Sequence, residues 1–295
     1  MQLENLSWFP GHMTKTRRMI AAELKNIDAV CEIVDARIPQ SSRNPELDEL
    51  TAGKPRLLVL NRIDQADAEA TRRWAVWFKS RGYAVIEADA RSGAGAGQFA
   101  PAVRSLLRDK LAAYEAKGQA GRVVRVMVLG IPNVGKSTFI NRVSGRKTAK
   151  AEDRPGVTRA KQWIPVDKTL ELMDTPGILW PKFDDQGVGM RLAFTGAVRD
   201  EVVDMEELAT RLIEYLGARY PEALRERYRI ESGEGADGWA LLNQAGRKRG
   251  FLISGGEVDT ERMSRVLLDE FRAGKLGRFT LEMPPEDDYG RRPEL

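Results

Sequence analysis

One eight-residue motif constrains this chain more than any other feature of its sequence. Residues 130–137 read Gly-Ile-Pro-Asn-Val-Gly-Lys-Ser and match the pattern G-x-x-x-x-G-K-[ST] at every fixed position. An apolar run that ends at Leu129 precedes the motif and an amphipathic stretch follows it, so the motif joins a predicted strand to a predicted helix. A chance glycine-lysine turn in that context is rare. The motif therefore predicts a phosphate-binding loop in an α/β fold with a mostly parallel sheet.

The residue types of this loop suit the phosphates of a nucleotide. Glycines let backbone N–H groups turn inward around phosphate oxygens, and the following helix adds the positive end of its dipole. Lys136 is expected to reach the β and γ phosphates, and the Ser137 hydroxyl is placed to ligate Mg²⁺. The predicted phosphate-binding set comprises Gly130, Asn133, Val134, Gly135, Lys136, Ser137 and Thr138.

Two later segments fit the same chemistry. Residues 174–177 read Asp-Thr-Pro-Gly after a predicted strand, where Asp174 can hold Mg²⁺ through water and the Gly177 N–H can sense the γ-phosphate. The same tetrapeptide is also an ordinary turn sequence. Between the two motifs, residues 154–159 form a polar loop whose Thr158 is expected to close on Mg²⁺ when a triphosphate is present. The predicted metal ligands are Ser137, Thr158 and Asp174.

A candidate base-reading motif follows the apolar strand 57–60. Guanine presents N1–H and an exocyclic amine on one edge, and a carboxylate can accept both. Residues 61–64 read Asn-Arg-Ile-Asp, so Asn61 and Asp64 supply the groups that a guanine site needs. The segment resembles the motif N-K-x-D with Arg62 in place of lysine, and a guanidinium can stack over the base as a lysine stem does. An Asn-x-x-Asp sequence after a strand is also a common turn.

A second segment with a base-reading pattern follows the predicted strand 84–86. Asp89-Ala90-Arg91 resembles a degenerate form of the S-A-K motif, whose backbone N–H contacts the guanine oxygen. Asp89 replaces the usual serine. These three residues complete the predicted nucleotide-binding set.

The order of the motifs identifies the class of fold, because both base-reading segments precede the phosphate loop. This order indicates a P-loop GTPase fold in circularly permuted order. The chain also opens with Trp-Phe-Pro-Gly-His-Met at 8–13, continues with Val-Asp-Ala-Arg-Ile-Pro at 34–39, and carries Ser-Ser-Arg-Asn-Pro at 41–45. With these segments it resembles the ribosome biogenesis GTPase A family, the YlqF-type permuted GTPases, over essentially its whole length.

The resemblance implies an activity and its partners. It implies binding of GTP and GDP with Mg²⁺, and GTP hydrolysis coupled to late maturation of the large ribosomal subunit in the cytoplasm. The implied partners are the precursor of that subunit and its ribosomal RNA, with no membrane and no DNA. Asn133 matches the position that helps to hold a monovalent cation in potassium-activated relatives, which adds K⁺ as a candidate cofactor.

The catalytic assignments also come from the resemblance. Ile178 stands where many GTPases carry the glutamine that orients the attacking water. In the family, a histidine in the Pro-Gly-His-Met segment is thought to take that role, and His12 is the single histidine of this chain. The implied catalytic set is His12, Lys136 and Thr158.

The chain is expected to form two domains. Residues 1–189 form the predicted GTPase domain, and helical windows without strands predict a small all-helical, ribosome-contacting domain over 190–283, followed by a frayed tail at 284–295. Gly187 and Gly189 are candidates for a hinge between the domains. The first 189 residues carry a net charge of +8 and the rest −4, which is compatible with a phosphate-rich partner for the first domain.

Composition excludes several classes of protein. One cysteine and one histidine exclude a disulfide scaffold and a zinc enzyme. No apolar stretch reaches the roughly 20 residues that a membrane-spanning helix needs. Two functional alternatives stay open at this point. One is a GTP-dependent binding switch with negligible hydrolysis, which the absence of glutamine at Ile178 favours, and the other is an ATPase, which Asn61 and Asp64 oppose.

Overall fold

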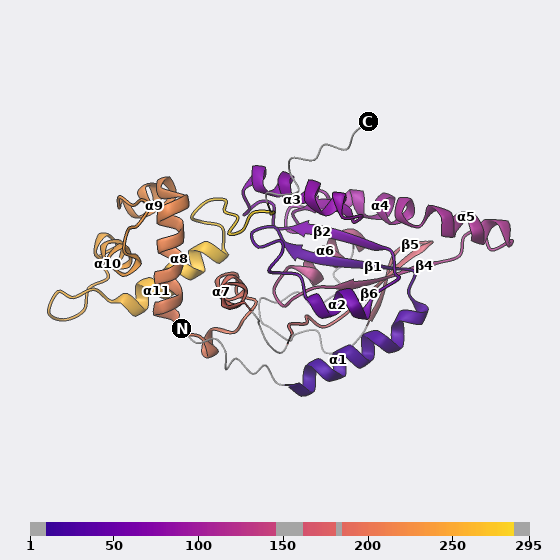
Figure 1. Cartoon of the computed structure of the whole chain (residues 1–295), viewed down its shortest axis with the longest axis horizontal. Coiled ribbons are helices and arrows are strands. Elements are labelled where there is room, and N and C mark those ends of the chain that lie inside the picture. The colour runs from indigo at the N-terminus through magenta and orange to yellow at the C-terminus, as the bar shows by residue number, and fades with distance from the viewer. Residues whose placement is uncertain (1–9, 146–161, 181–184, 286–295) are drawn as a thin grey trace. The chain divides into compact units, whose positions relative to one another are not determined.

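The computed structural model describes residues 10–145, 162–180 and 185–285, with side chains from residue 15 onward. It divides into two compact units (Figure 1). One contains the described residues up to 180 together with 280–285, and the other contains residues 185–279. The sequence-based division places the border after Gly189 and gives residues up to 283 to the helical domain. The structure instead places residues 185–189 in the helical unit and returns 280–285 to the first unit.

A six-stranded sheet forms the centre of the first unit. Its strand order is β3-β2-β1-β4-β6-β5, and only β5 runs antiparallel to its neighbour. All seven residues of β1 are buried, as expected for a central strand that is covered on both faces. The strands are β1 (Ala29–Asp35), β2 (Arg56–Asn61), β3 (Ala84–Ala88), β4 (Val124–Leu129), β5 (Gln162–Asp167) and β6 (Leu170–Asp174). The predicted, mostly parallel sheet is confirmed.

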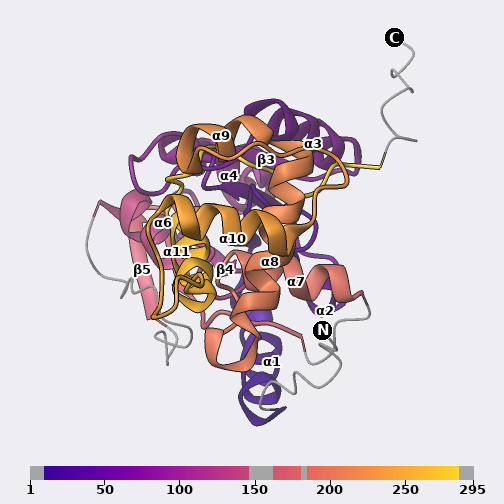
Figure 2. The same cartoon turned by 90° about the vertical axis from the view of Figure 1, so that its left-hand side faces the viewer.

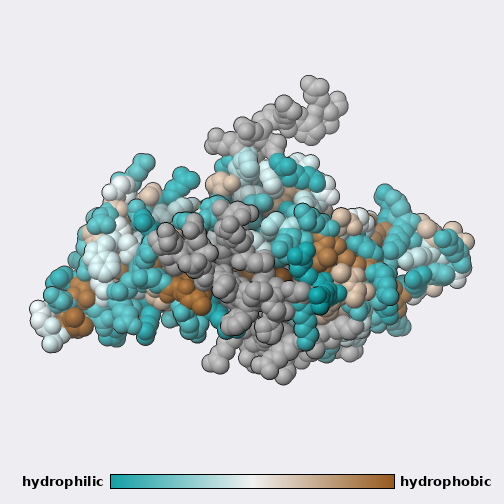
Figure 3. All heavy atoms as spheres, turned by 60° about the horizontal axis from the view of Figure 1, so that its bottom comes forward, coloured by the Kyte–Doolittle hydropathy of each residue, from teal (hydrophilic) through white to brown (hydrophobic). Residues whose placement is uncertain are grey.

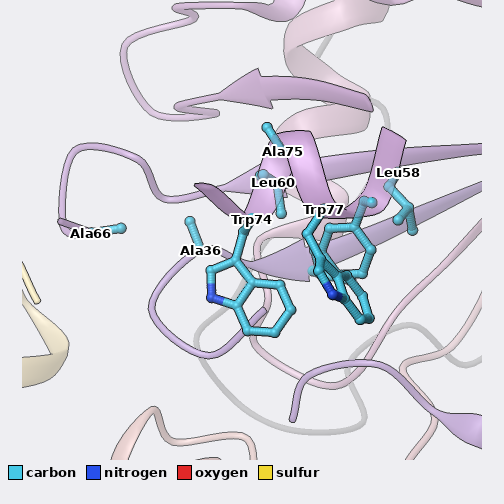
Figure 4. Packing of buried hydrophobic residues seen from close by; sticks show 9 residues of the cluster. Ala36, Leu58, Leu60, Ala66, Trp74, Ala75 and Trp77 are labelled. Carbon is cyan, nitrogen blue, oxygen red and sulfur yellow. The ribbon is translucent and has the colours of Figure 1, made fainter. Parts of the chain in front are cut away.

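Helices lie around this sheet (Figure 1). They are α1 (Pro10–Glu23), α2 (Pro45–Leu50), α3 (Ala68–Ser80), α4 (Phe99–Leu106), α5 (Arg108–Ala116) and α6 (Lys136–Ser144), with short 3-10 turns at Leu24–Asn26 and Ala96–Gln98. Aromatic side chains of α3 form much of one core cluster. Figure 4 shows Trp74 and Trp77 beside Leu58 and Leu60 of β2. These tryptophans pack in the core, as their helical spacing predicts.

The second unit is helical. It contains α7 (Gln186–Phe194), α8 (Met205–Arg219), α9 (Pro221–Tyr228), α10 (Gly238–Lys248) and α11 (Thr260–Arg272), with a 3-10 turn at Asp200–Val202. Helix α8 packs against both α10 and α11 (Figure 2). Gly238 permits the close approach of α10 to α8, because a Cβ there would lie 2.4 Å from the Thr210 carbonyl oxygen. Arg272 of α11 donates hydrogen bonds to both Asp200 carboxylate oxygens, each at 2.8 Å.

Residues 280–285, which we call the strap, return to the first unit and bind the loop that follows β1. Leu281 N donates to the Arg37 carbonyl oxygen at 2.7 Å, and Trp74 Nε1 donates to the Glu282 carbonyl oxygen at 2.9 Å. The Glu282 carboxylate accepts hydrogen bonds from Gln40 N at 2.5 Å and Ser41 N at 2.8 Å. The strap therefore fixes the loop after β1 through partners about 240 residues away in the sequence.

No helix within the described ranges is long and apolar enough to cross a membrane. The face shown in Figure 3 is mostly hydrophilic, with smaller hydrophobic areas between the polar ones.

Candidate functional site

The predicted site residues converge at one edge of the sheet. Strands β1, β2, β3, β4 and β6 are parallel, so their carboxyl ends lie at the same edge. In open α/β sheets this edge is where ligands bind. The segments that follow β2, β3, β4 and β6 are those that the sequence assigns to base reading, phosphate binding and Mg²⁺.

The phosphate loop joins β4 to α6 in a conformation that requires its glycines. Gly130 has φ +156°, and a Cβ there would lie 2.7 Å from the Ile33 carbonyl oxygen. Gly135 has φ +91°, and a Cβ there would lie 2.4 Å from Asn61 Nδ2. Helix α6 begins at Lys136, so its first backbone N–H groups face the end of the loop. Ser137 and Thr138 lie in the first turn of this helix.

Lys136 and Asp174 form a buried pair of opposite charge. Burial lowers the pKa of the Lys136 ammonium, and the Asp174 carboxylate opposes that shift. Burial likewise raises the pKa of the Asp174 carboxyl, against the opposing effects of Lys136 and of hydrogen bonds from Thr175 N and the Ser137 hydroxyl. Both charges are poorly solvated without a ligand. A polyanion and a divalent cation would stabilise them together.

The donor set fits Mg²⁺ on chemical grounds. Asp174 Oδ1 is buried and has no hydrogen-bond partner among the described residues, while the Ser137 hydroxyl is bonded to the same carboxylate. Mg²⁺ commonly takes one or two protein oxygens and completes its shell with phosphates and water. Within the described ranges, no group of three or more His, Cys, Asp or Glu residues forms a separate metal centre.

The segment after β6 packs along the phosphate loop. A Cβ at Gly177 would lie 2.8 Å from Pro132 N, so only glycine allows this approach. Ile178 N donates to the Gly130 carbonyl oxygen at 3.1 Å, and the Ile178 side chain is buried. A buried isoleucine cannot orient an attacking water. Ile178 therefore does not replace the glutamine that many GTPases carry at this position.

Asn61 connects the two predicted parts of the site. Its Nδ2 donates to the Val134 carbonyl oxygen of the phosphate loop at 2.8 Å, and its Oδ1 accepts from Ala90 N at 3.1 Å. Asp64 is half-buried, and no residue in the described part of the chain donates a hydrogen bond to its carboxylate. This carboxylate can therefore accept two hydrogen bonds from a ligand.

The loop after β3 contacts Asn61 through Ala90 N, whereas the Asp89 side chain makes its hydrogen bonds within the loop. The Asp89 carboxylate accepts from Arg91 N at 2.8 Å and Ser92 N at 3.1 Å. Burial alone would raise the pKa of Asp89, but the hydrogen bond from the Ser92 hydroxyl and those from the two N–H groups hold it below its usual range. Arg142 of α6 donates to the Ala90 carbonyl oxygen at 3.3 Å and to that of Arg91. The contact of Arg142 with this loop could not be predicted from the sequence. A basic residue in the last turn of a helix indicates only a favourable interaction with the helix dipole.

Arg62 lies against the phosphate loop. Its Nη2 donates to the Asn133 carbonyl oxygen at 2.7 Å, and its Nε lies 3.8 Å from Asp35 Oδ2 at the end of β1. Sequence reasoning expected Arg62 to stack on the base and did not identify Asp35 as its partner. Two predicted residues lie outside the described structure, namely Thr158 and the side chain of His12.

These features together define a class of protein. The sheet carries a phosphate loop after β4, Asp174 at the end of β6 with a hydrogen bond from Ser137, and an Asn-x-x-Asp segment after β2. If β4, the strand before the phosphate loop, is numbered 1 and the numbering continues along the chain and then from its start, the sheet order from the antiparallel edge is 2-3-1-4-5-6. In the same numbering the chain itself runs 4-5-6-1-2-3, which is a circular permutation of 1-2-3-4-5-6. The fold is that of a P-loop GTPase in circularly permuted order.

Comparison with known proteins identifies the family within this class. A family model described as "50S ribosome-binding GTPase" matches residues 125–220. The protein named ribosome biogenesis GTPase A of Bacillus cereus is 47% identical over 281 residues, covering 95% of each chain. A solved structure of GNP-bound YlqF from Thermotoga maritima is 27% identical, covers 92% of this chain and 98% of its own, and has a TM-score of 0.62. This chain belongs to the ribosome biogenesis GTPase A family. It is a guanine nucleotide-binding GTP hydrolase that acts in ribosome biogenesis.

Proposed function

We propose that this protein hydrolyses GTP to assist late maturation of the large ribosomal subunit in the cytoplasm. The nucleotide assignment depends mainly on the contacts of Asn61. Its side-chain amide makes hydrogen bonds with both the phosphate loop and the loop after β3. It brings the predicted base-reading and phosphate-binding residues to one place. The description of the matching family model as 50S ribosome-binding supports the large subunit as partner.

The proposed division of labour follows the geometry of the site. Asp64 accepts the guanine N1–H and amine, and the N–H groups of the phosphate loop and of the first turn of α6 bind phosphate oxygens. Lys136 binds the β and γ phosphates, and Ser137 and Asp174 hold Mg²⁺, with Thr158 assigned as a further ligand. When bound, Mg²⁺ would neutralise charge that develops on the phosphates. We retain K⁺ beside Asn133 as part of the proposal.

Binding to ribosomal particles should depend on the nucleotide. Residues 174–178 lie along the phosphate loop, and the helical unit follows a few residues later, so a change at the γ-phosphate is transmitted directly to that unit. We expect the GTP-bound form to bind large-subunit precursors about 5 to 150 times more tightly than the GDP-bound form, the usual range of allosteric coupling. Co-sedimentation with GDP or a non-hydrolysable GTP analogue measures this ratio, with small subunits as the control. Equal binding of both forms at matched salt contradicts the coupling.

The buried Ile178 supports a second candidate function. A protein without a water-orienting side chain at this place can act as a GTP-dependent placeholder on RNA with negligible hydrolysis. GTP turnover with and without large subunits separates the two functions. Turnover that stays negligible on the particles would favour the placeholder.

His12 is our proposal for the group that orients the attacking water. We expect His12→Ala to bind GTP as the unchanged protein does, because the histidine acts on water in the transition state and not on the bound nucleotide. Turnover on ribosomal particles should fall about 100-fold, the lower range for loss of general acid-base assistance. Single-turnover hydrolysis and calorimetric GTP binding are the measurements. Equal turnover of both proteins would remove His12 from the mechanism.

A further inference from the structure

Two consecutive carbonyl groups of the phosphate loop are held by two consecutive side chains. Arg62 Nη2 donates to the Asn133 carbonyl oxygen at 2.7 Å, and Asn61 Nδ2 donates to the Val134 carbonyl oxygen at 2.8 Å. In a trans peptide the C=O and the following N–H point in opposite directions. Because these carbonyls face the Asn61-Arg62 segment, the N–H groups of Val134 and Gly135 point the other way, into the loop. Arg62 thereby helps to aim phosphate-binding N–H groups.

The hydrogen bond from Arg62 falls on a residue with a left-handed backbone. Asn133 has φ +58°, a conformation that asparagine adopts more readily than most side-chain-bearing residues. A charge-assisted hydrogen bond to its carbonyl oxygen stabilises this conformation. Arg62 is itself left-handed, with φ +66°. Both ends of this contact therefore lie in the left-handed region, which is unfavourable for an arginine, and the hydrogen bond between them helps to fix both backbones.

Asp35 is the group that faces the Arg62 guanidinium from β1. Its carboxylate is buried and is held by Arg37, through Nε to Oδ1 at 2.9 Å and Nη2 to Oδ2 at 2.7 Å. Burial alone would raise the pKa of Asp35, but the guanidinium groups of Arg37 and Arg62 hold it below its usual range. The carboxylate therefore stays charged and presents Oδ2 at 3.8 Å from Arg62 Nε. No step of nucleotide binding described above uses Asp35.

We propose that Asp35 is a positioning residue of the nucleotide site: it orients the Arg62 guanidinium, which in turn holds the Asn133 carbonyl and the phosphate loop. In this arrangement Arg62 contributes to phosphate binding through the loop and does not stack on the plane of the base. A planar guanidinium can contact the carboxylate through Nε and the carbonyl through Nη2 at the same time, whereas an ammonium is a point charge. The inference rests on the proposed guanine site and adds a role for the end of β1.

The test separates the phosphate contribution from the base contribution to binding. Dissociation constants of GDP and of guanosine, each by competition against a fluorescent GDP analogue, give a ratio that reports on the phosphate loop alone. We expect Asp35→Asn to weaken GDP binding about tenfold, as for the loss of one charge-assisted contact, and to leave guanosine binding unchanged. Arg62→Met, which keeps an apolar stem for the base, should weaken GDP binding at least as much and also spare guanosine.

A double-mutant cycle shows whether Asp35 acts through Arg62. The double variant Asp35→Asn/Arg62→Met should bind GDP no more weakly than Arg62→Met alone, since Asp35 then has no guanidinium to orient. A merely structural role of Asp35 would give additive losses and overturn the proposal. Equal weakening of GDP and guanosine in Arg62→Met would mean that the side chain serves the base, and would also overturn it.

Two controls keep the test decisive. Arg104→Met removes an exposed arginine that pairs with Asp167 at 2.5 Å and should leave both dissociation constants unchanged. Asp64→Asn should weaken guanosine and GDP alike, so an unchanged guanosine affinity there would refute the base site independently. If Asp35→Asn fails to fold because Arg37 loses its partner, Arg62→Lys keeps that pair intact. A GDP-to-guanosine ratio in Arg62→Lys equal to that of the unchanged protein would then overturn the proposal.

Discussion

Replacing Lys136 by alanine is expected to lower kcat/KM for GTP on the order of 100-fold or more, as for the loss of a principal charge-stabilising donor. The ammonium is buried beside Asp174 at the start of α6, where its pKa is lowered by burial. Bound phosphates would add negative charge beside the ammonium and so favour its charged form. Without the lysine, the γ-phosphate loses a charge-assisted contact and Asp174 loses its buried counter-ion.

Lys54→Ala is the matched control for this experiment. Lys54 is a half-buried lysine whose Nζ donates to the Ile27 carbonyl oxygen at 2.7 Å, before the start of β1 and so at the opposite edge of the sheet. We expect its loss to leave GTP kinetics unchanged. Steady-state turnover and GTP binding of both variants are the measurements. Normal GTP turnover by Lys136→Ala would show that the phosphate loop does not have the assigned function.

Local spacing in the sequence is enough to select the segments that the fold gathers at one edge of the sheet. The Gly130–Ser137 loop and the Asn61–Asp64 segment each act over a few residues, and strand ends that share one edge bring them together. The strands at 57–60 and 84–86, the strand that ends at Leu129 and the helical windows beyond residue 190 are also predicted, because their periodicity is local. Leu107 separates α4 from α5, which follow each other directly along the chain.

Three elements escaped sequence reasoning because tertiary contacts or capping decide them. Helix α7 contains Gly187 and Gly189, which the sequence offers as candidates for a hinge between the domains. The Asp185 carboxylate accepts from Gly187 N at 2.7 Å and caps the helix there, and Gly189 is buried, so the cap and the packing override low helix propensity. Helix α1 and the six-residue α2 were also missed.

Long-range side-chain partners of the site could not be predicted at all. Asp35 lies 27 positions before Arg62, and nothing in the intervening residues links the two. Glu282 binds the backbone of Gln40 and Ser41 only because the strap returns from the end of the helical unit. An acidic residue between the helical windows and the tail has many possible partners, and only the fold selects one.

Asp64→Asn is expected to reverse the base preference of the site. Asparagine places an amide donor where guanine needs a second acceptor, so GDP binding should weaken by roughly 1–3 kcal/mol, the cost of an unsatisfied buried group, or about 5- to 150-fold. Xanthine carries a carbonyl oxygen in place of the guanine amine. The amide can donate to that oxygen and accept from N1–H, so xanthosine diphosphate should bind the variant more tightly than it binds the unchanged protein.

Asp67→Asn is the matched control, because it makes the same change three residues further along the same loop. Asp67 caps α3 by accepting from Ala70 N at 2.8 Å, and asparagine caps helices equally well. This variant should bind both nucleotides as the unchanged protein does. Calorimetric titration of the two diphosphates gives the ratio of their affinities, and that ratio distinguishes base reading from general damage, since damage weakens both. If Asp64→Asn leaves the ratio where it was, the carboxylate does not face the base, whatever happens to the absolute affinities.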